Sequence, residues 1–353
     1  MTDPAALPDL PLPEQRQVAI GHDAARTAVL AQLAEHRLPG AIMLQGPQGI
    51  GKATLAFELA TAILTATGDE DPKRVREQVA AMSHPNLALL RRRPKDAKGY
   101  YSVIRVEDIR ELRETLQHTR GRSGHRIAIL DSIDECNPSA ANALLKTLEE
   151  PPPYVKFIFA TTEIRKVPIT VLSRCQRFDL RRFDISELME LFGTICGKEG
   201  VEADEEALAL ISRAADGSAR DGLSILDQAM ALSNGRIAAA QVQEMLGLAD
   251  KALIFDLFEK VMGGKTAEAL ADVRAMYASG ADPVVMLQDL LDLTHLVTRL
   301  KTARDSALEG ASELERTRGV AFADKLSLPV LARTWQMLMK GLGEVQNAPS
   351  TLA

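Results

Sequence analysis

The residues with the clearest chemistry lie in the segment GPQGIGKATLA, residues 46–56. The segment matches the phosphate-loop pattern G-x-x-x-x-G-K-[ST] at both glycines and at Lys52, but Ala53 stands where a hydroxyl is required. In such a loop, backbone N–H groups hold the phosphates, the lysine reaches the outer ones, and the hydroxyl coordinates Mg²⁺. Thr54 does not replace that hydroxyl, because the next residue on a helix points about 100° away. The residues expected to form this degenerate nucleotide site are Gly46, Gly49, Gly51, Lys52, Ala53 and Thr54.

A second candidate for this site is Asp131, which directly follows the apolar run 127–130. Besides the Gly-rich loop, such sites need an acidic residue at the end of a neighbouring strand, and an Asp there meets this requirement. In proteins of this class that hydrolyse nucleotides, a Glu follows the Asp and positions the attacking water, but here the next residue is Ser132. Because phosphoryl transfer depends on positioning and on charge stabilisation, we expect little or no ATP hydrolysis. Binding of ATP or ADP stays open, as does a role for Mg²⁺, and a Gly-rich turn that binds nothing is the alternative.

Four apolar runs are expected to form the strands that position these residues. They are continuous rather than alternating, which is typical of a parallel sheet covered on both faces. Helical patterns lie between them, so the first half of the chain is predicted to be α/β. Asn137 is expected to cap a helix over 138–150, and Asp23 a helix that runs to about residue 36. The predicted strands are 41–44, 87–90, 127–130 and 157–160.

Strand signals nearly vanish beyond about residue 180. Helical patterns cover 187–196, 205–215 and 219–232, and from about residue 250 the chain is again mostly helical. The predicted domains are therefore 1–180, 181–248 and 249–353.

Later segments resemble a known family. The run NALLKTLEEPP at 142–152 resembles the signature of bacterial clamp-loader subunits, which are AAA+ proteins. Residues 173–175 resemble their SRC motif, 217–221 resemble their sensor 2 segment, and 161–162 lie where sensor 1 is expected. The resemblance runs from about residue 21 to residue 228. It implies an α/β AAA+ domain with a P-loop and a parallel sheet, a small helical lid domain and an all-α C-terminal collar for oligomerisation.

The resemblance favours the delta prime class of this family, in which the SRC motif is kept while the ATP site decays. The interval from Asp131 to Asn142 is similar to that in the active motor class, gamma/tau, and assigns Ser132 to the position of the catalytic Glu. Gamma/tau would also carry G-K-[ST] and a four-Cys zinc module, whereas this chain has three scattered cysteines. The segment SHPN at 83–86 also resembles delta prime, and the region of about 67–85 is expected to fold without zinc. An active, gamma/tau-like ATPase motor is the alternative.

The resemblance implies a stator subunit of the DNA polymerase III holoenzyme that helps to load the sliding clamp onto primed DNA. Its partners would be gamma/tau and delta subunits and, through the complex, the clamp and primer–template DNA. Arg174, with Ser173 and Cys175, would act in trans on ATP bound by a neighbouring gamma/tau subunit. Thr162 and Arg220 would belong to the degenerate nucleotide site. From the residues alone, a surface ion pair for Arg174, an acidic partner for Arg220 and a strand-capping role for 161–162 stay open.

Composition limits the other possibilities. The net charge of -6 argues against a basic nucleic-acid binder, although RRRPK at 91–95 is either a solvated loop or a patch that contacts DNA. The N-terminus is acidic and Pro-rich and lacks the layout of a secretory signal. No apolar run approaches the roughly 18 residues of a membrane span. A cytoplasmic protein without membrane contacts is expected.

Overall fold

The structure is a computed structural model that describes residues 12–16, 18–96, 99–117, 122–233, 235–246, 248–304 and 314–347. The first eleven residues of the expected N-terminal tail lie outside this set. The chain divides into two compact units, residues 1–236 and 237–353. The domain limits predicted at residues 180 and 248 stay predictions.

The first unit is built on a parallel five-stranded sheet in the order β2-β5-β6-β1-β7. Four of its strands, the edge strand β2 and the three central strands, are the predicted apolar runs, which are thereby confirmed. The fifth strand, β7, was missed, because at the sheet edge its side chains alternate between half-buried and exposed and include two charged residues. The strands are β1 (Ala41–Gln45), β2 (Leu87–Leu90), β5 (Arg126–Asp131), β6 (Val155–Thr161) and β7 (Gln176–Asp179).

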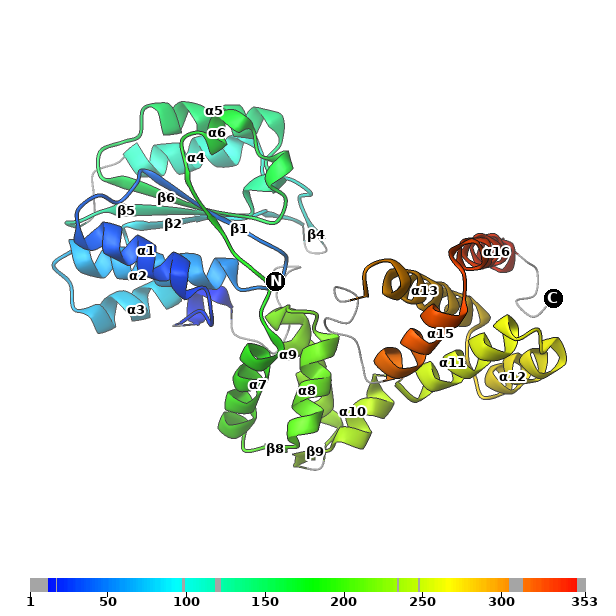
Figure 1. The fold of residues 1–353 in the computed structure, drawn as a ribbon. Helices are drawn as coiled ribbons and strands as arrows, with labels where there is room; N and C mark the ends of the chain where they lie inside the picture. The colour runs from blue at the N-terminus through cyan, green and yellow to red at the C-terminus, as the bar shows by residue number, and fades with distance from the viewer. Residues whose placement is uncertain are drawn as a thin grey trace. The chain divides into compact units, whose positions relative to one another are not determined.

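Helices cover both faces of this sheet (Figure 1). One layer contains α1 (Asp23–Ala34), α2 (Lys52–Thr67) and α3 (Pro72–Ala80), and the other contains α4 (Val106–Gln117), α5 (Pro138–Glu149) and α6 (Ile169–Leu172). This arrangement explains the continuous apolar runs, because each central strand is buried from both sides. A short antiparallel pair, β3 (Pro94–Asp96) and β4 (Gly99–Tyr100), follows β2.

The predicted helix starts are right in one case and wrong in the other. Asn137 caps α5, and its side-chain oxygen accepts a 2.8 Å hydrogen bond from the backbone N–H of Ala140. Asp23 is not a cap but the first residue of α1, and the capping position belongs to His22 in a left-handed conformation. Asp23 instead pairs with Arg26 one turn along the helix.

A small helical bundle follows the sheet within the first unit. It contains α7 (Ile185–Glu199), α8 (Glu205–Ala214) and α9 (Ala219–Leu232), as predicted, and a short pair of strands, β8 (Glu202–Ala203) and β9 (Arg236–Ile237). In α9, Ser218 is the cap and accepts a hydrogen bond from the backbone N–H of Asp221.

Beyond Ile237, helices joined by short connections make up the described residues of the second unit, whose own apolar core includes Phe255, Phe258 and Phe322. Within the described part of the chain, no helix is both long and apolar enough to cross a membrane. The helices of this unit are α10 (Ala239–Met245), α11 (Leu248–Met262), α12 (Thr266–Ala278), α13 (Pro283–Thr302), η4 (Glu315–Gly319), α15 (Val320–Lys325) and α16 (Leu328–Asn347).

Candidate nucleotide site

The Gly-rich loop connects β1 to α2, which is the strand–loop–helix context that phosphate binding requires. Lys52 is the first residue of α2 and is only 7% exposed. Its Nζ donates hydrogen bonds of 2.9 and 2.6 Å to the loop carbonyls of Gly46 and Pro47. Burial lowers the pKa of Lys52 to about 8, against the opposing effect of the Asp131 and Asp134 carboxylates.

The loop opens into a cavity of about 330 Å³, a volume within the range of small-ligand sites. The predicted residues Gly49, Gly51, Lys52, Ala53, Thr54, Asp131, Thr162 and Arg220 all line it, and so does Ser132. Gly46 contributes instead through its carbonyl group, which accepts from Lys52.

Asp131 reaches the cavity because it ends β5, and the carboxyl ends of parallel strands meet at one edge of a sheet. The Nε of Arg91, the residue that follows β2, lies 3.7 Å from the Asp131 carboxylate. Ser132 adjoins Asp131, and the 3₁₀ turn Ile133–Glu135 follows it, so Glu135 lies one turn beyond Ser132. Glu135 lines the cavity and pairs with Arg92 at 2.9 Å.

The two threonines at the end of β6 have different surroundings. Thr162 donates from its hydroxyl and its backbone N–H to the Asp134 carboxylate, at 3.0 and 3.3 Å. Thr161 is fully buried, and its hydroxyl accepts from the backbone N–H of Glu163. Only Thr162 of the pair lines the cavity.

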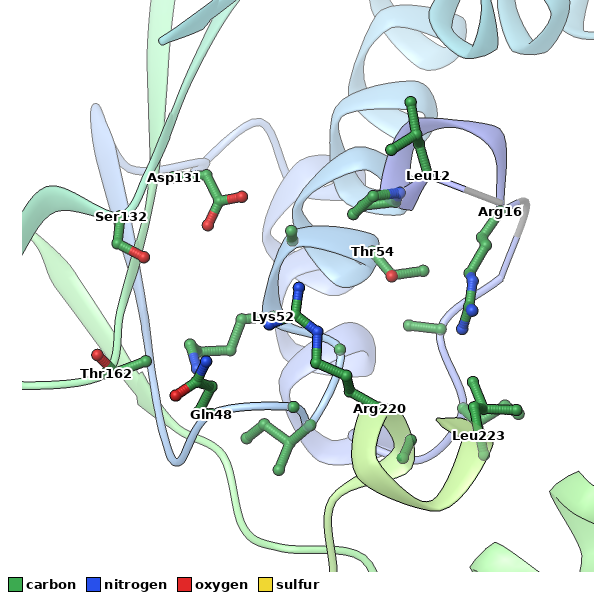
Figure 2. Close-up of a pocket in the computed structure, with 18 of the residues that line it drawn as sticks. Leu12, Arg16, Gln48, Lys52, Thr54, Asp131, Ser132, Thr162, Arg220 and Leu223 are labelled. Carbon is green, nitrogen blue, oxygen red and sulfur yellow. The ribbon is translucent and has the colours of Figure 1, made fainter. Parts of the chain in front are cut away.

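Helix α9 closes the cavity from the helical bundle. The backbone N–H of Arg220 donates to the carbonyl of Gly49 in the loop at 3.2 Å. The Arg220 side chain points into the cavity, toward Lys52 and Thr54 (Figure 2). Gly49 has φ of +79°, and a Cβ there would lie 1.9 Å from the Ser218 hydroxyl, so this glycine permits the close contact.

The other end of the cavity is apolar, and sequence reasoning missed it. Its side chains come from separate segments, none of which carries a motif. His22 helps to shape this end, because its Nε2 lies 2.7 Å from the Ile50 carbonyl and its ring packs against Phe183. The cavity therefore joins an apolar end, near Leu12 and Leu223, to a polar end at Lys52 and Asp131 (Figure 2). The apolar lining residues are Leu12, Pro13, Val18, Ala19, Ile20, Ile50, Phe183, Leu191 and Leu223.

The basic run 91–95 was singled out as a possible DNA patch, but its arginines have carboxylate partners within the chain. Arg91 makes two hydrogen bonds to Glu14, at 3.2 and 2.9 Å, and lines the cavity with Arg92. Arg93 pairs with Asp108 at 3.1 Å and with Glu111 at 2.7 Å. All three guanidinium groups are thus paired with carboxylates of this chain, which argues against a free basic surface.

The SRC residues lie outside the cavity, in the turn after α6. Arg174 pairs with Glu149 at 2.9 Å and donates to the Thr170 carbonyl at 2.8 Å, with its side chain 37% exposed. Ser173 donates to the same carbonyl at 3.0 Å. Burial raises the pKa of the Cys175 thiol to about 12, so the thiol stays protonated and is a poor nucleophile.

Three family models match consecutive parts of the chain. They are "DNA polymerase III, delta subunit" at 21–184, "DNA polymerase III clamp loader subunit, ATPase lid domain" at 188–235, and "DNA polymerase III subunits gamma and tau domain III" at 237–353. The chain belongs to the DNA polymerase III clamp-loader family. The family resemblance predicted from the SRC and neighbouring motifs is confirmed at this level, whereas the choice between the delta prime and gamma/tau classes is not.

Relatives among known proteins carry gamma and tau names. The chain is 32% identical over 283 residues to DNA polymerase III subunit tau of Salmonella typhimurium, which covers 80% of this chain and 43% of that protein. It is 28% identical over 342 residues to subunit gamma of Buchnera aphidicola, covering 96% and 92%. The chain thus spans about half the length of the tau relatives it matches.

Among solved structures, the RuvB Holliday junction branch migration motor of Thermotoga maritima has a similar fold. The TM-score is 0.50 at 15% identity, and the match covers 71% of this chain and 80% of that chain. Together with the parallel sheet and the ATPase lid match, this confirms the predicted α/β AAA+ fold followed by helical regions.

Proposed function

We propose that this clamp-loader protein is a delta prime-type subunit, a stator that helps to load the sliding clamp onto primed DNA in the cytoplasm. The proposal rests on two features that this chain combines, a degenerate nucleotide site and an arginine outside that site. Its own site lacks the hydroxyl at Ala53 and the carboxylate at Ser132, while Arg174 lies outside that site with a partly exposed guanidinium. A subunit of this kind would contribute to a neighbour's reaction rather than catalyse its own.

In this proposal Arg174 reaches the ATP bound by an adjacent gamma/tau subunit, with Ser173 and Cys175 holding its turn. The Glu149 partner does not prevent this role, because an exposed ion pair contributes only about 0–1 kcal/mol and is readily exchanged for a phosphate. Gamma/tau and delta are the proposed partner subunits, and the complex would contact the clamp and primer–template DNA.

The cavity supports a further part of the proposal, namely that the chain binds ATP or ADP without useful hydrolysis. Lys52 lies at the loop as phosphate binding requires, and Arg220 points toward it from α9 (Figure 2). The apolar end suits a nucleobase. Ala53 cannot coordinate a metal ion, and Ser132 cannot position the attacking water as a Glu would. Both losses affect ATP turnover more than nucleotide binding.

The alternative is an active, gamma/tau-like motor. It is favoured by the names of the relatives and by the family model matched at 237–353. ATP turnover by the purified chain, lost in Lys52→Ala, would support this alternative. Absence of turnover in the purified chain would favour the stator.

The test of the proposal is ATP turnover, stimulated by clamp and DNA, in a loader reconstituted with gamma/tau and delta. Arg174→Ala is expected to lower this turnover by about 10³-fold, as loss of an arginine finger does elsewhere, while the complex still assembles. The matched control is Arg177→Ala, because Arg177 is a nearby exposed arginine that pairs with Asp179 at 2.6 Å. Both variants should keep their stability to within about 1 kcal/mol. Equal turnover in the two variants would remove Arg174 from the mechanism.

A further inference from the structure

Arg91 occupies an unusual position for a residue of a nucleotide site. It follows β2, the strand beside β5, so it starts from the same sheet edge as Asp131. Its Nε lies 3.7 Å from the Asp131 carboxylate, and both terminal nitrogens bond to Glu14, which is only 8% exposed. The guanidinium also lies over the Phe57 ring, 5.7 Å from its centroid. Glu14 and the Phe57 ring therefore hold Arg91 beside Asp131.

The surroundings of Asp131 do not fit Mg²⁺. This ion requires oxygen ligands in near-octahedral geometry, and Ala53 cannot supply the hydroxyl that the motif normally provides. Asp131 already has a cation beside it, so a second cation on the same carboxylate would be repelled by Arg91. The fold therefore balances the Asp131 charge with its own guanidinium.

The cavity also carries enough positive charge to receive phosphates. Five basic side chains line it, against the lining carboxylates of Asp131 and Glu135 and the Glu14 carboxylate that Arg91 binds. Guanidinium groups match phosphate oxygens well, because they are planar, always charged and able to donate two parallel hydrogen bonds. The basic lining residues are Arg16, Lys52, Arg91, Arg92 and Arg220.

We propose that this cavity binds a nucleoside diphosphate or triphosphate without Mg²⁺, with Arg91 standing where the metal would lie beside Asp131. The inference rests on the proposed nucleotide binding and deepens it. Lys52 and Arg220 contact the phosphates, and Glu14 orients Arg91. Since Arg91 never dissociates, the site retains its nucleotide when free Mg²⁺ is removed.

The first test measures ADP and ATP binding to the full unmodified chain by calorimetry, in excess Mg²⁺ and in EDTA. The dissociation constants in the two buffers are expected to agree within about threefold, a difference of under 1 kcal/mol. Binding seen only with Mg²⁺ would overturn the inference and leave nucleotide binding intact. Absence of binding in both buffers would overturn both, while the proposed role of Arg174 would still be decided by its own assay.

The second test compares two neighbouring variants. Arg91→Ala is expected to weaken ADP binding in EDTA by about 10- to 100-fold, because it removes a positive charge that replaces the metal ion near the phosphates. Arg93→Ala is the matched control, because Arg93 pairs with Asp108 and Glu111 and is not among the residues lining the cavity. Because the Arg91→Ala substitution removes the partner of the buried Glu14, circular dichroism would verify that this variant still folds. Equal ADP affinity in the two folded variants would show that Arg91 takes no part in nucleotide binding and would overturn the proposal.

Discussion

At the scale of single residues, the fold makes the Lys52 ammonium group easier to deprotonate than a lysine in water. Burial lowers its pKa to about 8, and Asp131 and Asp134 only partly oppose that effect. The two loop carbonyls that accept from Nζ would be replaced or joined by phosphate oxygens in a complex. An anion favours the protonated lysine, so nucleotide affinity and pH are linked.

The affinity for ADP is therefore expected to fall as pH rises through 8. Below pH 8 Lys52 is already protonated and affinity is constant, whereas above pH 8 binding must first add a proton. Between pH 7 and pH 9 the dissociation constant should rise about tenfold. Calorimetry at both pH values measures this change, and Lys52→Arg, which stays charged, serves as the control. An unmodified chain with a flat pH profile would contradict the depressed pKa of Lys52.

At the scale of elements, the nucleotide loop and helix α9 are joined at Gly49. Its carbonyl accepts from the Arg220 backbone, and its missing side chain leaves room for Ser218. Gly51 has a similar φ of +83°, but a Cβ there would meet no atom within 4 Å. The two glycines thus share a backbone requirement and differ in packing.

This difference makes a matched pair of variants. Gly51→Ala should lower the free energy of unfolding by about 1–2 kcal/mol through left-handed strain alone. Gly49→Ala should cost about 1–3 kcal/mol more, because the methyl group collides with the cap of α9. Urea unfolding of the full chain, followed by circular dichroism, measures both. Equal losses would mean that α9 moves away from the loop without cost.

At the scale of the whole molecule, the chain consists of two units, each with an apolar core of its own. The sheet core of the first includes Phe157 and Phe159, and the helical core of the second includes Phe255, Phe258 and Phe322. The only tryptophan of the chain, Trp335, lies in α16 of the second unit. Its fluorescence therefore reports on one unit, whereas circular dichroism reports on both.

We expect the two units to unfold in separate transitions. Gly49→Ala should then shift the unfolding curve seen by circular dichroism and leave the midpoint seen by Trp335 fluorescence unchanged. The measurement is urea unfolding of the full-length variant and the unmodified chain, with both signals recorded on each sample. A shift of equal size in both signals would show that the chain unfolds as a single cooperative unit.

The amino-acid sequence by itself determined the layered architecture and the polar half of the site. Continuous apolar runs predicted β1, β2, β5 and β6, because strands buried on both faces have no need for polar positions. Local motifs predicted the loop with Lys52, the acidic residue Asp131 and the cap at Asn137, because each depends on neighbours in the chain. The edge strand β7 was not predicted, because its residues are mostly polar and do not form an apolar run.

Only the tertiary structure decided which distant residues share the cavity. Arg91 belonged to a basic run that could have been a solvated loop or a DNA patch, and its pairing with Glu14 depends on contacts 77 residues apart. The apolar end is assembled from Leu12, Ile50, Phe183 and Leu223 without any local pattern. Burial, which lowers the pKa of Lys52, is likewise a property of the assembled fold. Sequence spacing fixes local geometry, whereas charge compensation and cavity shape arise only when separate elements pack.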